Sequence, residues 1–243
     1  SGFVASTFMR GIPFMQIPTT ILAHDSAVGG KVAINHPAGK NMIGAFYQPE
    51  AVIYDMQFLE SLPLRERRSG FAEVIKHGLI QDEAFYQWLL DHIKSLEQLN
   101  ESELIHFLAR GIEIKSVIVS QDEKETGVRA YLNFGHTLGH AIEAEMGYGK
   151  ITHGEGIIIG MLFALKLSVK YAGLSFNVDS LVQWLKELGY QTETPEGLAP
   201  EKLVQWMKGD KKSIGQQIRM VLLEKIGTPI IYEMTEEEIL REL

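Results

Sequence analysis

The stretch that decides the fold contains two neighbouring helix starts: Asn133-Phe134-Gly135-His136-Thr137-Leu138-Gly139-His140-Ala141-Ile142-Glu143 and Thr152-His153-Gly154-Glu155. His136 and His140 lie four residues apart, and a helix brings such positions onto one face. A third histidine, His153, comes just before another long apolar run. Two helix starts of this kind can bring imidazoles together around a metal ion. The site also needs a carboxylate, and the best candidate is Glu73, in Ala72-Glu73-Val74-Ile75-Lys76-His77-Gly78.

The composition is that of an ordinary globular protein, with 45% hydrophobic and 22% charged residues in 243. The formal net charge of −8 argues against a broad nucleic-acid surface, so an anionic ligand needs a local cluster of cations. The chain has no cysteine, which leaves histidine and carboxylate as metal ligands. There is no recognisable signal peptide, and the longest apolar stretch, residues 156–169, is shorter than the roughly 20 residues of a membrane span. We therefore expect a cytoplasmic protein without a membrane segment.

Secondary-structure patterns divide the chain near residue 56. Before that point, short strands are predicted at 13–17, 31–35 and 51–54, with a helix opened by Thr19 and Thr20, a turn at 25–31 and a loop at 37–41. Beyond it, helices are predicted at 64–79, 83–99, 101–121, 135–146, 154–171, 179–188 and 200–208. A strand pair at 219–223 and 229–232 precedes a last helix that begins after Thr235. The predicted fold is an α/β segment, residues 1–55, followed by a mainly α-helical domain, residues 56–243.

Glu73, His136 and His153 together predict a zinc site. Isolated histidines are usually surface residues, but these lie at helix starts with glycine beside them, so that backbone can pack close to the ligand atoms. Two histidines and a glutamate are a known zinc ligand set that leaves one position open for substrate. His140 is the spare imidazole, which can support a ligand or carry a proton near neutral pH. His24, His36, His92 and His106 are assigned to surface or structural positions.

Two further groups of residues stay open on local sequence alone. Lys115, Arg129 and the pair Lys211-Lys212 are either solvated charges or an anion pocket, and arginine suits phosphate. The region from Thr19 to Asn41 is either two ordinary turns or a polar cradle for a phosphate-bearing ligand. It contains no GxGxxG or Walker motif that would decide between the two.

With these segments in view, the chain resembles 3-dehydroquinate synthase, of the sugar phosphate cyclase group. The matching motifs run almost from end to end: Phe8-Met9-Arg10-Gly11, Ile17-Pro18-Thr19-Thr20, Asp25-Ser26-Ala27-Val28-Gly29-Gly30-Lys31, Gly39-Lys40-Asn41, the Glu73 segment, Arg129 through Glu143, His153-Gly154-Glu155 and Asp210-Lys211-Lys212. The motifs are specific jointly, because all of them occur in the same order.

The resemblance implies a role for each matching residue. It places zinc, with cobalt as an alternative, on Glu73, His136 and His153. It places NAD on Thr19, Thr20, Lys31 and Lys40. The substrate pocket is implied to contain Asp25, Asn41, Lys76, Lys115, Arg129, Asn133, His140, Lys211 and Lys212. Arg10 matches an arginine that the family lends across a homodimer interface.

The implied reaction is a lyase step of the shikimate pathway of aromatic amino acid biosynthesis. The seven-carbon sugar phosphate DAHP is cyclised to 3-dehydroquinate with loss of inorganic phosphate, and NAD transiently oxidises a hydroxyl. The family has further nucleotide-binding α/β structure upstream of the segment that matches residue 3. We therefore expect a truncated chain that binds NAD poorly and has little activity.

Three other interpretations share some of these motifs. Another sugar phosphate cyclase, such as a 2-deoxy-scyllo-inosose synthase, would turn over glucose 6-phosphate in place of DAHP. A metal-dependent polyol or glycerol dehydrogenase would accumulate NADH, whereas a cyclase recycles its NAD. A non-catalytic, zinc-stabilised helical module would bind metal but no anionic sugar analogue.

Overall fold

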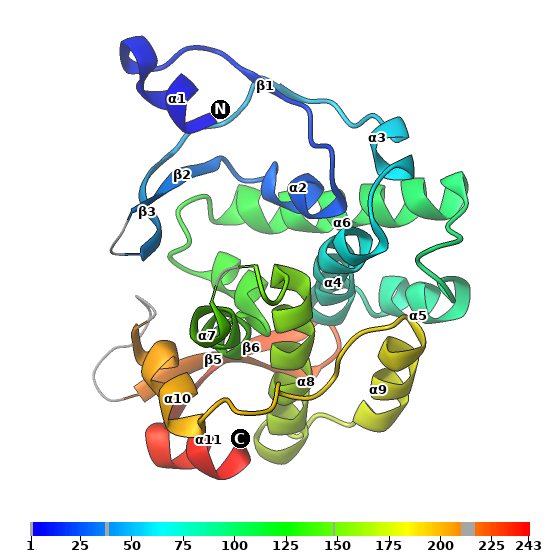
Figure 1. Ribbon diagram of the computed structural model, residues 1–243, viewed down its shortest axis with the longest axis vertical. Helices are drawn as coiled ribbons and strands as arrows, with labels where there is room; N and C mark the ends of the chain where they lie inside the picture. The colour runs from blue at the N-terminus through cyan, green and yellow to red at the C-terminus, as the bar shows by residue number, and fades with distance from the viewer. Residues whose placement is uncertain (1, 37–38, 148, 210–216) are drawn as a thin grey trace.

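The computed structural model describes residues 2–36, 39–147, 149–209 and 217–243, and it shows a small α/β part above a larger helical part (Figure 1). The α/β part contains α1 (Gly2–Thr7), η1 (Phe8–Arg10), β1 (Met15–Gln16), α2 (Ile21–Ser26), β2 (Lys31–His36), β3 (Gly39–Phe46) and β4 (Ala51–Val52). β1 pairs with β4 in parallel, whereas β2 and β3 form an antiparallel hairpin. The short helix α3 (Gln57–Glu60) leads into the helical part.

The helical part contains α4 (Leu64–Gln81), α5 (Glu83–His92), α6 (Glu101–Gln121), η2 (Val128–Asn133), α7 (His136–Met146), α8 (His153–Tyr171), α9 (Val178–Glu187), α10 (Pro200–Gly209) and α11 (Glu236–Glu242). Between α10 and α11, β5 (Gln217–Lys225) and β6 (Thr228–Thr235) pair antiparallel. Within the described residues, no helix combines the length and the apolar content needed to cross a membrane.

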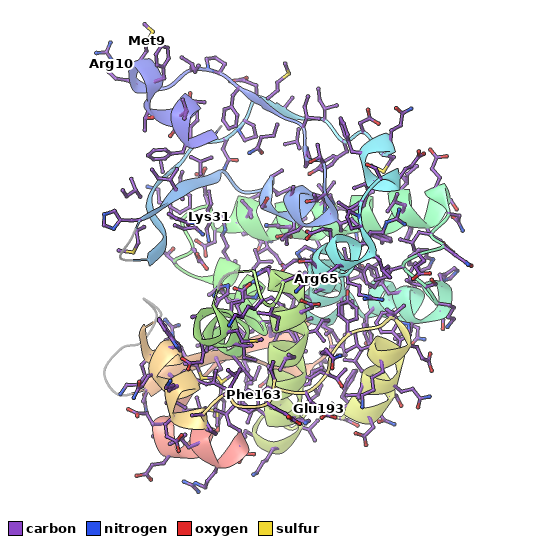
Figure 2. The ribbon with its side chains drawn as sticks, in the orientation of Figure 1. Met9, Arg10, Lys31, Arg65, Phe163 and Glu193 are labelled. Carbon is purple, nitrogen blue, oxygen red and sulfur yellow. The ribbon has the colours of Figure 1, made fainter. Side chains whose placement is uncertain are left out.

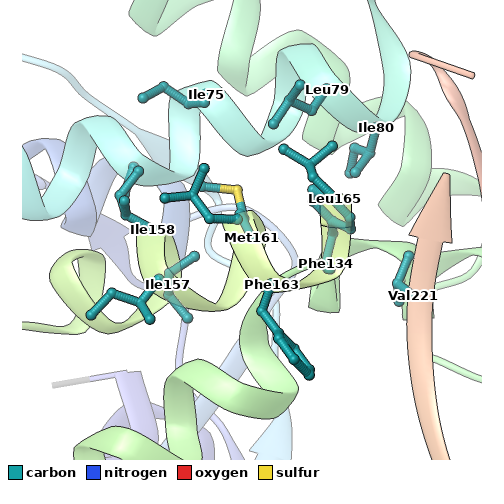
Figure 3. Close-up of a cluster of buried hydrophobic side chains, with 14 of the residues drawn as sticks. Ile75, Leu79, Ile80, Phe134, Ile157, Ile158, Met161, Phe163, Leu165 and Val221 are labelled. Atoms are coloured by element: carbon teal, nitrogen blue, oxygen red, sulfur yellow. The ribbon is translucent and has the colours of Figure 1, made fainter. Parts of the chain in front are cut away.

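Helix α8 lies at the centre of the core. Ile158, Met161 and Leu165 of α8 are at most 1% exposed. They lie beside Ile75 of α4 and Val221 of β5 (Figure 3). A helix with buried residues on nearly every side is held by its neighbours rather than by solvent contacts. The helices α4 and α8, which carry Glu73 and His153, are therefore fixed relative to each other by this packing.

A capping box sets the first residue of α8. The backbone N–H of Glu155 donates to Thr152 Oγ1 at 3.3 Å, and the Thr152 N–H donates to the Glu155 carboxylate at 2.6 Å. Two of the unpaired N–H groups at the helix start are satisfied in this way. Because the helix begins at His153, that imidazole is placed at the end of α8 that faces α4 and α7.

Two glycines allow the backbones of these helices to approach closely. A Cβ atom on Gly160 of α8 would lie 1.9 Å from the carbonyl oxygen of Gly135, which precedes α7. A Cβ atom on Gly154 would lie 2.1 Å from the carbonyl oxygen of Ser69 on α4. The start of α7 thus meets the middle of α8, and the start of α8 meets α4 at Ser69; at Gly160 and Gly154 no other residue type would fit without movement of the backbone.

Most elements that the sequence predicts are present, with three corrections. The predicted loop at 37–41 is wrong from Gly39 onward, because strand β3 begins there and pairs with β2. The helix predicted to Leu99 ends at His92, since Ile93 adopts an extended conformation and accepts a hydrogen bond from Trp184 Nε1 at 2.9 Å. The turn predicted from Asp25 begins later, because Asp25 belongs to α2. Pairing with the neighbouring strand overrides the local pattern in the first case, and a contact with the distant helix α9 accompanies the early helix end in the second.

The buried His24 makes the stability of this fold depend on pH. Its Nε2 lies 2.7 Å from the Leu108 carbonyl oxygen and donates to it, and the residue is 2% exposed. Burial lowers the pKa of His24 to about 4, and the positive charges of His77 and Lys115 act in the same direction. The hydrogen bond to Leu108 and the negative charge of Asp25 oppose this effect. The Tyr54 ring packs against the imidazole. A lowered pKa means that folding favours the neutral imidazole. The stabilisation is complete above about pH 6.5 and is lost as the pH falls toward 4, by up to about 3 kcal/mol.

We therefore expect the unfolding free energy of the His24→Gln variant to fall less than that of the unchanged chain between neutral pH and pH about 4. Urea unfolding at the two pH values measures this difference. Parallel pH profiles for the two proteins would show that His24 does not carry the effect.

Candidate functional site

Three potential ligand atoms converge where α4, α7 and α8 meet. Glu73 lies in the middle of α4, whereas His136 and His153 are the first residues of their helices. Glu73 Oε1 is 3.5 Å from His136 Nε2 and 3.4 Å from His153 Nε2. Within the described residues, this buried oxygen accepts no hydrogen bond. A carboxylate oxygen without a donor, facing two imidazole nitrogens, is an arrangement that fits a metal cation.

The other nitrogen of each imidazole faces an acceptor. His136 Nδ1 is 3.2 Å from the Phe134 carbonyl oxygen, and His153 Nδ1 is 3.0 Å from Glu143 Oε1. Each acceptor favours a proton on Nδ1, which leaves the Nε2 lone pair directed at Glu73. Both imidazoles are thus oriented as metal ligands by hydrogen bonds from the opposite side of the ring.

Buried charges set the protonation of these ligands. Burial favours the neutral acid of Glu73, but Lys76, whose Nζ contacts Glu73 Oε2, and His136 hold the pKa of the carboxyl well below its usual value. Burial and Lys76 hold the pKa of His136 well below its ordinary value, so this imidazole is neutral. Burial also acts to lower the pKa of His153, but Glu143 and Glu73 raise it to about 9. Without a bound cation the two carboxylates therefore favour an imidazolium at His153, and a metal cation would take the place of its Nε2 proton.

His140 adds a third imidazole to the same wall. Its ring centroid is 5.1 Å from that of His136 and 5.6 Å from that of His153. Nitrogen atoms of the three histidines lie within 4.8 Å of one another, so an all-histidine set is a geometric alternative to the set that contains Glu73. The orphaned Oε1 atom favours the set with Glu73.

A cavity of about 1220 Å³ opens beside these residues, and its lining comes from both the α/β part and the helical part. The structure brings eleven of the residues predicted for the site to its walls: Asp25, Lys31, Asn41, Glu73, Lys76, Lys115, Arg129, Asn133, His136, His140 and His153. Four of these residues are cations, and they come from four different elements: Lys31 of β2, Lys76 of α4, Lys115 of α6 and Arg129 of η2. Cations that are distant in sequence therefore line one cavity together with Glu73, His136 and His153. The sequence alone left this convergence open.

Asp25 fixes the lysine of α6 that faces the cavity. Lys115 Nζ donates to Asp25 Oδ2 at 2.7 Å and to the Asp25 carbonyl oxygen at 2.5 Å. Burial favours the neutral acid, but Lys115 and His77 hold the pKa of Asp25 well below its usual value. His77 Nε2 lies 3.1 Å from Asp25 Oδ1, although neither ring nitrogen forms a well-aligned hydrogen bond within the described residues.

The segment before η2 holds another part of the wall. The Asp122 carboxylate accepts hydrogen bonds from the backbone N–H groups of Thr126, Gly127 and Arg129 at 2.7–3.0 Å. This bracing supports Glu125, which has a φ of 59° and is therefore in the left-handed region. Glu125 contacts Lys31 Nζ and accepts from Asn133 Nδ2 at 2.8 Å. One carboxylate thus ties β2 to η2 across the cavity mouth.

Sequence reasoning missed three residues of this site. Glu143 and His77 both stood inside quoted motifs but were given no role. Glu125 carries no local signal, because its position depends on the turn that Asp122 stabilises. A strained conformation at a non-glycine residue is visible only in the structure.

Three predicted residues are not brought to the cavity. Arg10 is exposed at the outer end of the α/β part (Figure 2). Thr19 is exposed, and Thr20 is used as the N-cap of α2, where its hydroxyl accepts from the Ala23 N–H at 2.9 Å. The predictions for Lys40, Lys211 and Lys212 concern side chains outside the described part of the structure.

Comparison with known proteins identifies the family and the fold. The model of the 3-dehydroquinate synthase N-terminal domain matches residues 1–69, and that of the C-terminal domain matches residues 70–213. The 3-dehydroquinate synthase of Halalkalibacterium halodurans is 58% identical over 243 residues, which are 100% of this chain and 67% of that protein. The enzyme of Geobacillus kaustophilus is 56% identical over 240 residues, 99% of this chain and 66% of that protein.

Solved structures show the same fold. A 2-deoxy-scyllo-inosose synthase complexed with carbaglucose-6-phosphate, NAD+ and Co2+ superimposes with a TM-score of 0.88 at 28% identity and covers 99% of this chain and 68% of its own. A 2-epi-5-epi-valiolone synthase from Streptomyces hygroscopicus has a TM-score of 0.89 at 23% identity, with the same coverage. The fold and these sequence matches together define a protein of the sugar phosphate cyclase class. The chain belongs to the 3-dehydroquinate synthase family, and it spans about two thirds of the length of the curated relatives that it matches.

Proposed function

We propose that this chain provides the metal- and substrate-binding part of a 3-dehydroquinate synthase, which converts DAHP to 3-dehydroquinate and inorganic phosphate. The proposal rests on one observation: Glu73 Oε1 faces His136 Nε2 and His153 Nε2 at the wall of a cavity that is also lined by cations. The names of relatives that are 55–58% identical support this activity over other cyclase reactions.

The proposed cofactors are NAD and zinc, with cobalt as an alternative metal. Two imidazoles and a carboxylate are a known zinc set, and the 2-deoxy-scyllo-inosose synthase of the same fold is described with NAD+ and Co2+. Zinc, when bound, polarises substrate oxygens, and NAD accepts and returns the hydride. Thr19, Thr20, Lys31 and Lys40 are proposed to contact NAD.

The chain's own residues would bind and orient the substrate. Lys76 holds Glu73 ionised, so the carboxylate is ready to act as a ligand. Asp25 fixes the ammonium group of Lys115, and the Gly29 carbonyl accepts from the Arg129 guanidinium at 3.0 Å. These cations are thus held in place to neutralise the phosphate and the carboxylate of the substrate. His140, next to both histidine ligands, is placed to move a proton.

The domain division at residues 55 and 56 is part of the same proposal. Residues 1–55 would belong to an NAD-binding α/β domain and residues 56–243 would form the zinc and substrate domain. Large apolar side chains at least 36% exposed are concentrated in the first 58 residues, and they include Phe8, Met9 and Met15. Exposed apolar surface of this extent marks a contact with further protein. A homodimer in the cytoplasm, with Arg10 at the subunit interface, completes the proposal.

The test is phosphate release by the zinc-loaded chain with NAD and either DAHP or glucose 6-phosphate. We expect phosphate from DAHP alone, with no net NADH, and we expect His136→Ala to release none. Calorimetric titration of DAHP is run in parallel, so that binding is measured even where turnover is slow. Accumulation of NADH would indicate a polyol dehydrogenase, and zinc binding without DAHP binding would indicate a non-catalytic module.

A second candidate is a 2-deoxy-scyllo-inosose synthase, which the superposition at a TM-score of 0.88 favours. Release of phosphate from glucose 6-phosphate, but not from DAHP, would select it. The 28% identity to that enzyme, against 58% to a 3-dehydroquinate synthase, places it second.

A further inference from the structure

Glu143 lies on the same face of α7 as two of the histidines at the site. It follows His136 by seven residues and His140 by three, which is the spacing of one helix face. Its side chain is 17% exposed, and it lines the cavity. Its Oε1 atom reaches across to α8, where it lies 3.0 Å from His153 Nδ1.

We propose that Glu143 is a positioning residue of the metal centre, which holds the His153 imidazole in the Nδ1–H form with Nε2 directed at the metal. This inference rests on the proposed metal site formed by Glu73, His136 and His153. Glu143 does not reach the metal position itself, because His153 stands between Glu143 Oε1 and Glu73 Oε1.

The two histidine ligands differ in how they are held. His136 Nδ1 faces the Phe134 carbonyl, a backbone group that lies two residues before it, just ahead of the start of α7. His153 Nδ1 faces a side chain on another helix, 10 residues earlier in the chain. The orientation of His153 therefore depends on a side chain that substitution can remove, whereas that of His136 does not.

The packing between α7 and α8 leaves room for this contact. A Cβ atom on Gly156 would lie 3.4 Å from Glu143 Cγ, and one on Gly139 would lie 2.8 Å from the Ile157 side chain. These glycines let the helices approach until a glutamate on α7 reaches the first residue of α8. Hydrogen-bonded acceptors behind a metal-bound histidine fix its tautomer and ring orientation, and their loss typically weakens metal binding about 10- to 100-fold.

Glu145 provides a matched control on the same helix. It carries the same charge two residues further on, but its carboxylate faces α10. There it accepts from Trp206 Nε1 at 3.0 Å and pairs with Lys202 Nζ at 3.0 Å. Its removal changes the net charge as much as removal of Glu143 does, without touching His153.

The experiment compares affinities for Zn²⁺ by competition with a chromogenic chelator, and the visible absorption of the Co²⁺-loaded chain. We expect Glu143→Ala to weaken Zn²⁺ binding about 10- to 100-fold and to change the Co²⁺ spectrum. Glu143→Gln retains an acceptor oxygen and should lose less, and Glu145→Ala should match the unchanged chain. In a His153→Ala background, Glu143→Ala should have no further effect.

Equal Zn²⁺ affinity of Glu143→Ala and Glu145→Ala would overturn the inference, and so would an undiminished effect of Glu143→Ala in the His153→Ala background. Thermal unfolding followed by circular dichroism identifies a variant that is not folded, in which case Glu143→Gln decides the question. Failure of the unchanged chain to bind Zn²⁺ would overturn the proposed metal site itself. Zn²⁺ binding that is insensitive to Glu143 would overturn only the positioning role.

Discussion

Glu73→Gln is expected to lower the affinity of the chain for zinc by more than about 100-fold. That factor is the largest loss of metal affinity that is typical when a residue supporting a ligand, and not the ligand itself, is replaced. Glutamine keeps the shape of the side chain and its contact with Lys76, but its amide is a poor ligand compared with a carboxylate. The neutral amide also removes the negative charge that faces His136 and His153. The remaining two imidazoles would have to hold the cation without a charged partner.

Two substitutions of Glu73 distinguish its effect on zinc binding from its effect on the stability of the fold. The Glu73 and Lys76 side chains are 2% and 3% exposed, so the pair is buried. Removal of one member of a buried ion pair leaves an uncompensated charge, which costs about 3–5 kcal/mol. We expect Glu73→Ala to be destabilised by about this amount in addition to the loss of zinc, whereas Glu73→Gln retains an acceptor for Lys76 and should be destabilised much less.

Plasma mass spectrometry after dialysis gives the zinc content, and competition titration gives the affinity. Glu66→Gln, on an exposed position in the first turn of α4, is the matched control and should bind one zinc per chain like the unchanged protein. Retention of zinc by Glu73→Gln, together with its loss in His140→Ala, would contradict this ligand set. The metal would then be held by His136, His140 and His153, whose nitrogens are also close enough.

The local sequence was sufficient to predict the helix starts that carry the ligands. His136 and His153 stand next to glycines, and the helix predicted from Gly154 begins one residue earlier, at His153. The identity of the carboxylate was also accessible, because Glu73 lies in a helix whose pattern is apolar on several sides. These features depend on neighbours within about one helical turn, which a sequence displays directly.

Features that depend on distant contacts could not be predicted in this way. The helix predicted to Leu99 ends at His92, and Ile93 accepts a hydrogen bond from Trp184, which is 91 residues further along the chain. The convergence of Lys31, Lys115 and Arg129 requires three elements to fold onto one cavity, and no spacing in the sequence encodes it. Glu125 owes its position to the turn braced by Asp122. The spacing of residues in a sequence predicts which of them share one face of a helix. Which helices and strands come together around a cavity is decided by tertiary packing.

The second large effect is expected for Gly160→Ala, which should destabilise the fold by about 3 kcal/mol or more, at or above the usual upper limit for overpacking. The added Cβ atom would lie 1.9 Å from the Gly135 carbonyl oxygen and 2.9 Å from the Gly139 nitrogen. Both are backbone atoms of the α7 region, and they cannot move aside as a flexible side chain can. The clash can be relieved only by separation of α7 from α8.

That separation should also weaken the metal site, because α7 carries His136 and α8 carries His153. Urea unfolding followed by circular dichroism measures the stability, and competition titration measures the affinity for zinc. Lys166→Ala, an exposed change on the same helix, is the control and should alter stability by no more than about 0.5 kcal/mol. A Gly160→Ala variant with unchanged stability would mean that α7 and α8 are further apart than described. Loss of zinc affinity in proportion to loss of stability would show that the packing of these two helices holds the ligands in place, seven residues away from the nearer of the two histidines.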